Sequence, residues 1–102
     1  MVATFYAYPG CDSCRKARRW LDDHGVAYRE LNIAATPPDA ATLRAAQARA
    51  GVPLRRLFNT SGQLYRDGGY AARLETMDDD AALAELAAHG MLIRRPLLLA
   101  DG

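Results

Sequence analysis

The sequence predicts a small α/β fold with at least one pair of parallel strands. Short apolar segments typical of strands alternate with longer segments in which apolar residues recur at helical spacing. Their order is strand, helix, strand, then helical and irregular pieces, then helix and strand, which indicates an α/β layer. Because the chain has 102 residues, we expect a single domain over residues 1–102.

Composition excludes several classes of protein. Half of the residues are hydrophobic (50%) and a quarter are charged (25%), as in ordinary globular domains. With 13 basic and 12 acidic residues the net charge is +1, so neither nucleic acid nor an anionic membrane is expected as a partner. No apolar run approaches the roughly 18 residues of a membrane span, and no signal peptide is apparent. We therefore expect a cytoplasmic, soluble monomer.

The first half of the chain predicts a strand, a helix and a second strand. Residues 4–8 are rich in β-branched and aromatic side chains and stop at a Pro-Gly turn, and residues 26–33 alternate loosely, so both segments are predicted to be strands. From Ser13 the pattern becomes helical until Gly25. The residues Cys14, Ala17, Leu21 and His24 form one stripe, with Trp20 beside it. We expect Trp20 and Leu21 to lie in the core.

The second half predicts two further helices and a final strand. Asp39 is expected to cap a helix that ends at Gly51. Residues 52–74 hold three turn signals and read as short helical pieces and loops. The acids 78–80 suit the start of a third helix, which Gly90 would end. The apolar faces of these helices would be Leu43, Ala46 and Ala50, and then Leu83, Leu86 and Ala87.

The C-terminal segment predicts a loop over residues 91–95 that leads into a buried strand over residues 96–100. Asp101-Gly102 is a hairpin signal, which indicates a further strand after it.

The two cysteines, Cys11 and Cys14, lie where the first strand gives way to the first helix. Unpaired N–H groups and the helix dipole stabilise a thiolate there, and Arg15 and Lys16 would add positive charge. We therefore expect the Cys11 pKa to lie below that of a free thiol, with Asp12 moderating the effect. Cys14, one turn further on, could resolve an adduct on Cys11 as an internal disulfide.

A Cys-x-x-Cys pair also has alternatives to thiol chemistry. A zinc site would need two further ligands, and only His24 and His89 are available. An inert buried pair is a second alternative, because free cysteine is often core. A phosphatase-like loop would need arginine where the chain has Ala17, so that reading fails. No metal is expected.

With the segments 11–17 (CDSCRKA) and 92–97 (LIRRPL) in view, the chain resembles the thioredoxin-fold arsenate reductase family, whose other branch is the Spx-type transcription regulators. Residues 57–62 and 89–93 also look like the reductase-like members. The resemblance covers essentially the whole chain. It implies a thioredoxin-like (glutaredoxin-like) mixed sheet with flanking helices and an inserted helical part over roughly residues 38–90.

The resemblance also implies roles for particular residues. Cys11 aligns with the catalytic cysteine, and Arg95 aligns with the arginine that binds the oxyanion. Pro96 corresponds to the cis-proline that faces the active site. Asp12 and Ser13 at the helix start, together with Asn59 and Arg94, complete the expected substrate-binding set.

Three departures from the family pattern matter. The glutaredoxin-coupled members have one active-site cysteine, whereas Cys14 supplies a second here. Those members carry arginine where this chain has Asn59, and a further family arginine would fall beyond Gly102. The anion site therefore has fewer arginines than the family pattern. Arg56, Arg66 or Arg94 could take the place of the missing ones.

The expected function is the reduction of arsenate to arsenite, with Cys11 as nucleophile, Cys14 as resolving cysteine and Arg95 holding the oxyanion. No bound cofactor is expected, because sulfur carries both electrons, which would come from thioredoxin, glutaredoxin or glutathione. Two alternatives stay open. One is a Spx-like redox-sensing regulator that binds RNA polymerase, and the other is a general thiol–disulfide oxidoreductase.

Overall fold

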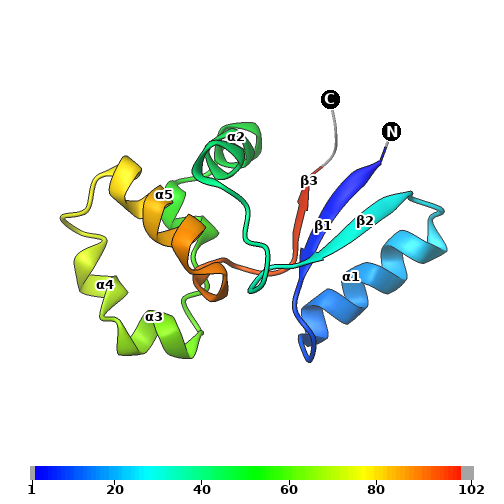
Figure 1. Cartoon of the computed structure of the whole chain (residues 1–102), viewed down its shortest axis with the longest axis horizontal. Helices are drawn as coiled ribbons and strands as arrows, with labels where there is room; N and C mark the ends of the chain where they lie inside the picture. Colours follow the sequence, from blue (N-terminus) through cyan, green and yellow to red (C-terminus); the bar gives the residue numbers. More distant parts are fainter. Residues whose placement is uncertain (1, 100–102) are drawn as a thin grey trace.

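The computed structural model describes residues 2–99, so the expected strand after Asp101-Gly102 lies outside the described residues. The helices and strands follow the predicted order (Figure 1). Two short 3₁₀ helices, η1 and η2, are present in addition. They are β1 (Ala3–Ala7), α1 (Asp12–Asp23), β2 (Tyr28–Asn32), α2 (Ala40–Ala50), η1 (Leu54–Leu57), α3 (Gln63–Asp67), α4 (Tyr70–Arg73), α5 (Asp79–Ala88), η2 (Gly90–Leu92) and β3 (Leu97–Leu99).

The three strands form one mixed sheet in the order β2-β1-β3. β1 pairs with β2 in parallel, with Ala3 opposite Tyr28, because α1 carries the chain back across the sheet. β1 pairs with β3 antiparallel, with Thr4 opposite Leu99. The α/β fold with a parallel pair is thus confirmed.

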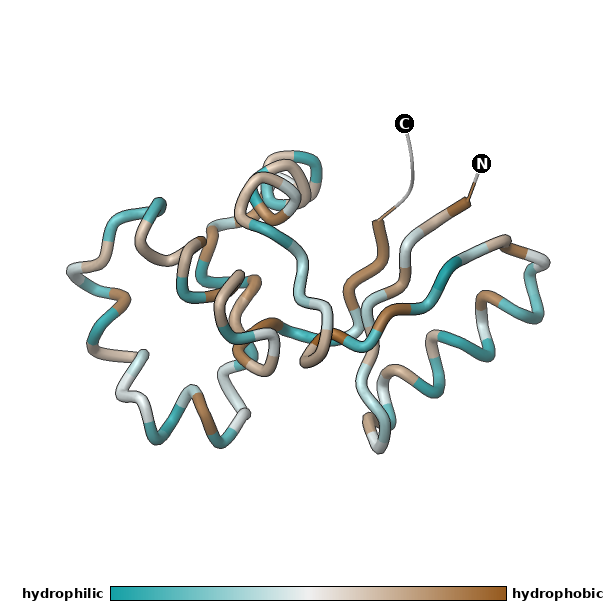
Figure 2. Tube along the Cα trace, viewed as in Figure 1, coloured by the Kyte–Doolittle hydropathy of each residue, from teal (hydrophilic) through white to brown (hydrophobic). Residues whose placement is uncertain are grey.

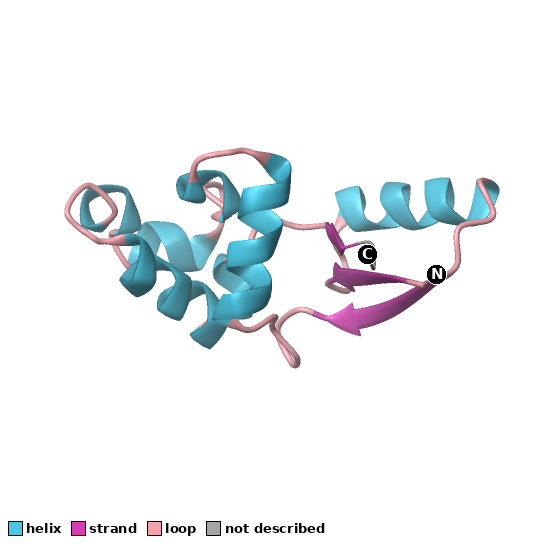
Figure 3. Ribbon diagram, turned by 90° about the horizontal axis from the view of Figure 1, so that it is seen from above, coloured by secondary structure: helices cyan, strands magenta, loops and turns pink. Residues whose placement is uncertain are grey.

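The side chains of β1 alternate between two cores, as the period of a strand requires. Phe5 and Ala7 are buried against α1. Tyr6 points into a larger core formed mostly by the helices between β2 and β3. The hydropathy of the chain differs between the strands: β3 is hydrophobic along its length, whereas β2 contains a hydrophilic stretch (Figure 2). Seen from above, α1 covers one side of the sheet and the other helices lie at the opposite end of the molecule (Figure 3).

The exposure of Trp20 contradicts its predicted place in the core, although Leu21 is buried as expected. Successive helical residues are rotated by about 100°, so the face that buries Cys14 and Leu21 leaves Trp20 at its side. Trp20 is 54% exposed. Its ring stacks on His24 with centroids 3.9 Å apart, and His24 is itself exposed rather than part of the buried stripe.

The last strand is also less buried than predicted. Leu97 and Leu99 are only partly buried, and Leu98 is 45% exposed. Leu98 lies opposite Phe5 and so shares the sheet face that α1 covers. The described core against α1 is made by β1 and β2 with the helix, and it does not extend to Leu98.

The predicted apolar faces of α2 and α5 meet each other. Leu43, Leu83 and Leu86 are buried in the larger core, and Ala87 packs against it. The expectation for Ala50 is wrong: this residue ends α2 and is exposed, because the helix packs through its earlier turns.

The third predicted helix ends earlier than expected. α5 stops at Ala88, and Gly90 begins η2 instead of ending the helix. Gly90 is buried with its α-carbon against the Ile33 backbone, where a β-carbon would overlap the carbonyl oxygen. This position therefore requires glycine because two backbones approach closely.

Asp78 caps α5 as the acidic run predicts, since its Oδ1 accepts a hydrogen bond from the Ala81 N–H at 2.7 Å. Asp78→Ala is expected to lower the free energy of unfolding by about 1 kcal/mol. Asp79→Ala is the matched control: it also removes a first-turn carboxylate but no capping bond, so only a few tenths of a kcal/mol are expected. Urea unfolding measures both. Equal losses would show that charge, and not capping, matters here.

Candidate active site

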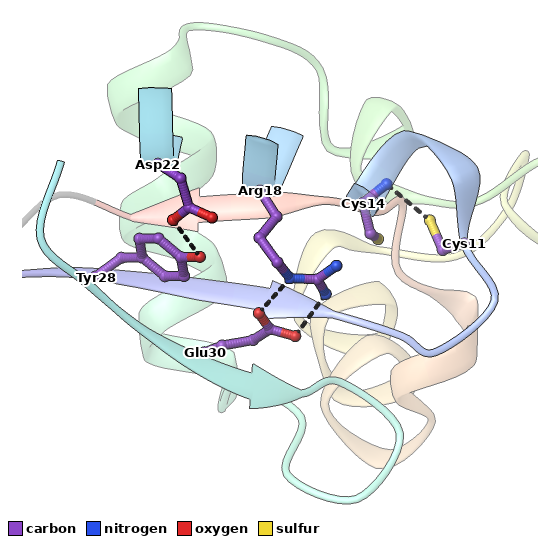
Figure 4. A network of polar contacts seen from close by, with 6 residues as sticks. All are labelled: Cys11, Cys14, Arg18, Asp22, Tyr28 and Glu30. Carbon is purple, nitrogen blue, oxygen red and sulfur yellow. Dashed lines mark hydrogen bonds and ion pairs between the residues drawn. The ribbon is translucent and has the colours of Figure 1, made fainter. Parts of the chain in front are cut away.

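Cys11 occupies the N-cap of α1, directly after the Pro9-Gly10 turn. The Cys14 backbone N–H donates to the Cys11 Sγ at 3.2 Å (Figure 4). The Cys11 N–H donates to the Tyr8 carbonyl at 3.2 Å. Cys11 is partly exposed, whereas Cys14 is fully buried, and both are free thiols. The arrangement leaves one sulfur open to a substrate and keeps the second within the same helical turn.

The pKa values of the two thiols are shifted in opposite directions. Burial raises the pKa of Cys11, but hydrogen bonds from Cys14 and the positive charge of Arg95 outweigh it, so this pKa lies below its usual range. Burial and the hydrogen bond to Cys11 raise the pKa of Cys14. Cys11 is therefore the sulfur that ionises first, and Cys14 stays protonated as a donor to it.

The source of the positive charge differs from the sequence prediction. Arg15 forms an ion pair with Asp12 on the exposed side of α1. The cation among the main causes of the lowered Cys11 pKa is Arg95, whereas Arg15, Lys16 and Asp12 are not among its main causes. Arg15 and Asp12 offset each other's charge, so little field from that pair reaches the sulfur.

The Arg95 side chain is positioned by a hydrogen bond to Met91 and by a contact with the Tyr8 ring. Its Nη1 donates to the Met91 carbonyl at 3.3 Å, and its guanidinium lies 5.5 Å from the centre of the Tyr8 ring. The Arg95–Pro96 peptide bond is cis, as the resemblance implied. Sequence reasoning did not identify Tyr8 or Met91 as supports for Arg95, because their contacts with it arise only in the folded chain.

A short backbone ladder brings the second half of the site into place. Phe58 and Ile93 form an isolated antiparallel bridge. Beside it, the Arg94 N–H donates to the Leu57 carbonyl and the Asn59 N–H donates to the Leu92 carbonyl, both at 2.7 Å. Asn59 and Arg94, which are far apart in sequence, consequently lie on either side of this bridge.

These elements surround a cleft of about 240 Å³, here called the oxyanion cleft, which joins the start of α1 to the ladder. Its lining residues are Ser13, Phe58, Asn59, Thr60, Ser61, Arg94 and Arg95. Four of the predicted site residues, Ser13, Asn59, Arg94 and Arg95, thus come together. Asp12 instead lines a separate cleft along α1, and Arg56 and Arg66 do not line the oxyanion cleft. Arg94 is therefore the candidate that stands beside Arg95.

Behind the site, polar contacts fix α1 to the sheet. Arg18 donates two hydrogen bonds to the Glu30 carboxylate, at 2.8 and 2.7 Å, and the Tyr28 hydroxyl donates to Asp22 at 3.0 Å (Figure 4). The hydrogen bonds from Arg18 hold the pKa of Glu30 below its ordinary value. Because α1 carries both cysteines, this connection keeps the N-terminus of the helix at a fixed place beside β1.

Within residues 2–99, no group of three or more His, Cys, Asp or Glu side chains is arranged to hold a metal ion. In the same part of the chain no helix has the length and apolar character needed to cross a membrane.

Alkylation should distinguish the two thiols and identify the cation. Because the thiolate is the form that reacts, Cys11 is expected to be labelled by iodoacetamide at a lower pH than a free thiol, while Cys14 stays unlabelled. Arg95→Gln should move the Cys11 profile to higher pH and slow labelling at neutral pH by a few-fold. Arg15→Gln is the matched control and should leave the profile in place. A shift in the control alone would contradict the assignment to Arg95.

Comparison with known proteins gives the site a family context. Residues 6–102 match the model of the ArsC family. The chain is 45% identical over 97 residues to the "Uncharacterized protein YusI" of Bacillus subtilis (strain 168), covering 95% of this chain and 82% of that protein. It is 28% identical over 96 residues to the "Regulatory protein MgsR" of the same organism, covering 94% and 75%.

A solved structure described as a "possible arsenate reductase from Streptococcus mutans UA159" superposes with a TM-score of 0.90. It is 43% identical and the match covers 95% of this chain and 82% of that chain. The mixed sheet with flanking helices is the thioredoxin-like fold of these proteins, and the predicted fold class is confirmed. Since the family model spans nearly all of the chain, the chain belongs to the ArsC family.

Proposed function

We propose that this protein reduces arsenate to arsenite by thiol chemistry. The observation that supports this best is the position of Cys11. Its sulfur accepts the Cys14 N–H at the start of α1, and its pKa is lowered by Cys14 and Arg95. Arg95 also lines the oxyanion cleft, so a nucleophile and an anion-binding group meet at one place.

Arsenate is a tetrahedral oxyanion, and the cleft offers donors suited to it. Arg94, Arg95, Asn59 and Ser13, whose side chains carry such donors, line the cleft. Guanidinium groups bind oxyanions in a fixed, charge-assisted geometry. The N-terminus of α1 adds the positive end of its dipole. These groups would hold the arsenic atom facing the Cys11 sulfur.

The proposed chemistry transfers two electrons from sulfur to arsenic. The Cys11 thiolate attacks arsenic and forms a sulfur–arsenic bond. One arsenate oxygen takes up protons and leaves as water. Cys14 then attacks the Cys11 sulfur. The sulfur–arsenic bond breaks with its electron pair remaining on arsenic, which leaves as arsenite, and a Cys11–Cys14 disulfide forms. The buried position and raised pKa of Cys14 keep it from competing for the first step.

The disulfide must then be reduced by an external thiol. We propose thioredoxin or a similar dithiol donor for this step, with glutaredoxin or glutathione as other sources of electrons. The proposal requires no bound cofactor, because both electrons pass through sulfur.

The similarity to one relative favours a second candidate function. The similarity to a protein named as a regulator, MgsR, supports a role in which the Cys11–Cys14 pair senses oxidants and the protein binds RNA polymerase. A regulator of this kind would form the same disulfide but would not turn over arsenate. The identity to the possible arsenate reductase, at 43%, is higher than that to MgsR, at 28%, which supports the reductase as first choice.

A coupled assay separates the two candidates. The purified protein is mixed with thioredoxin, thioredoxin reductase and NADPH, and arsenate is added last. Consumption of NADPH that depends on arsenate, with arsenite as the product, is the expected result. No turnover, together with retention of RNA polymerase on the immobilised protein, would contradict the reductase and support the regulator.

A further inference from the structure

The sulfur of Met91 lies against Arg95, the cation that acts on Cys11. The Arg95 Nη1 donates a hydrogen bond to the Met91 carbonyl at 3.3 Å, and the same nitrogen lies 3.8 Å from the Met91 Sδ. A thioether sulfur is only a weak acceptor, so the bond to the carbonyl is the stronger of the two contacts. The sulfur nevertheless occupies a place from which a change in its chemistry would act directly on the guanidinium.

The Met91 side chain is accessible from the surface. It is partly buried and lines two clefts, one of about 340 Å³ that Arg95 also lines and one of about 220 Å³ beside His89. Residues 2–99 hold one other methionine, Met77, which is also partly buried. Met77 packs against the larger core and lines neither of these two clefts. The two methionines therefore differ in their neighbours and not in their degree of burial.

Peroxides oxidise methionine by transferring one oxygen atom to its sulfur. The thioether sulfur attacks a peroxide oxygen, the oxygen–oxygen bond breaks, and a sulfur–oxygen bond forms. With hydrogen peroxide the other oxygen leaves as water, so the sulfur loses the two electrons that the peroxide gains. The sulfoxide is polar, and a hydrogen bond from a guanidinium to its oxygen is charge-assisted.

We propose that Met91 is an oxidation site that controls the reactivity of Cys11 through Arg95. The sulfoxide oxygen accepts a hydrogen bond from Arg95 and holds the guanidinium on the Met91 side, away from the Cys11 sulfur. A small peroxide is the co-reactant, and methionine sulfoxide reductases would reverse the change. The inference does not depend on arsenate, because a reductase and a redox-sensing regulator would both use the Cys11 thiolate.

The direction of the effect follows from the charge of Arg95. Its positive charge and its hydrogen bond are among the causes that lower the pKa of Cys11. A guanidinium held farther from the sulfur stabilises the thiolate less, because the Coulomb energy falls with distance. Oxidation of Met91 should therefore raise the pKa of Cys11 and lower the fraction of thiolate at neutral pH.

The test keeps Cys11 out of reach of the oxidant. In the full chain Cys11 is first blocked as a mixed disulfide with methyl methanethiosulfonate, hydrogen peroxide is then added, and dithiothreitol finally removes the block. Peptide mass spectrometry measures the sulfoxide at each methionine, and labelling with iodoacetamide across a range of pH measures the reactivity of Cys11. Met91→Leu removes the oxidisable sulfur at similar side-chain volume, and Met77→Leu is the matched control. Each variant is compared with its own untreated sample.

Peroxide treatment of the wild-type protein is expected to slow the labelling of Cys11 at neutral pH by a few-fold and to move its profile to higher pH. Methionine sulfoxide reductases should restore the original profile. The same treatment should leave the profile of Met91→Leu in place and should shift that of Met77→Leu as in the wild-type protein. In Arg95→Gln the treated and untreated samples should agree, because the effect passes through the Arg95 guanidinium.

Three outcomes would overturn the proposal. Met91 could resist peroxide under conditions that oxidise Met77, or Cys11 could keep its profile in protein that carries the Met91 sulfoxide. The profile could also shift to the same extent in treated Met91→Leu or in treated Arg95→Gln. None of these measurements contains arsenate, so failure of this inference is distinguishable from failure of the proposed reductase, which the coupled assay measures separately.

Discussion

Cys11→Ser is expected to reduce arsenate-dependent NADPH consumption to the rate measured without enzyme. A serine hydroxyl at the N-cap can still accept the Cys14 N–H, so α1 should keep its start. It cannot supply an ionised sulfur at neutral pH, and no sulfur–arsenic bond can form. Circular dichroism and the melting temperature of the variant should stay close to those of the wild-type protein, which ties the loss to chemistry and not to folding.

Cys14→Ser is the matched comparison, because it removes the other sulfur of the pair. Turnover with thioredoxin should also be lost, yet the first step should survive, and mass spectrometry should detect arsenic bound to Cys11. Unchanged steady-state turnover in Cys14→Ser would remove Cys14 from the mechanism. Residual turnover in Cys11→Ser above the enzyme-free rate would overturn the assignment of the nucleophile.

Gly90→Ala is expected to be the most destabilising small substitution among the described glycines. The added methyl carbon would overlap the Ile33 carbonyl oxygen and lie 2.7 Å from the Ile33 carbonyl carbon. Both atoms belong to backbone that continues from β2, so neither can rotate away as a side chain would. We expect a loss of about 3 kcal/mol or more in the free energy of unfolding, a large share of the roughly 5–15 kcal/mol that stabilises a typical domain.

Gly51→Ala provides the control for Gly90→Ala. Gly51 ends α2 with a φ of +65°, and an added β-carbon there meets no atom within 4 Å. The substitution therefore costs only the left-handed backbone, about 1–2 kcal/mol. Urea unfolding of both variants gives the comparison. If Gly90→Ala is no less stable than Gly51→Ala, the close approach of η2 to Ile33 is not the constraint that the structure indicates.

Local sequence signals predicted the elements of the fold well, because their causes are local. Asp39 and Asp78 cap the helices they precede, and Gly51 adopts the left-handed conformation that ends α2. The burial predictions were wrong where the exposure of a side chain depends on which other elements pack against it. Trp20 and Leu98 are apolar residues in regular elements, yet each is about half exposed because the packing partner covers an adjacent position.

The candidate site was predictable in part. A Cys-x-x-Cys pair at a strand-to-helix turn indicates a nucleophilic thiol from sequence alone, and its place at the N-cap is confirmed. The cation that acts on Cys11 was not predictable from spacing, since Arg15 and Lys16 are nearer in sequence than Arg95. The role of Arg95 entered only through the resemblance to a family.

The sequence by itself therefore determined the strand-to-helix turn, the thiol pair and the small α/β fold, because each depends on hydrogen bonds and dihedral preferences within a few residues. Tertiary structure alone decided which arginine lies close enough to act on the Cys11 sulfur and which residues line the cleft beside it. The ladder between Leu57 and Arg94, and the contact of Arg95 with Tyr8, join segments that are far apart in sequence. The contact of Arg95 with Met91 joins residues that are close in sequence, and it helps to position the same guanidinium. An electrostatic field depends on distance in space, and distance in space is set by the packed fold.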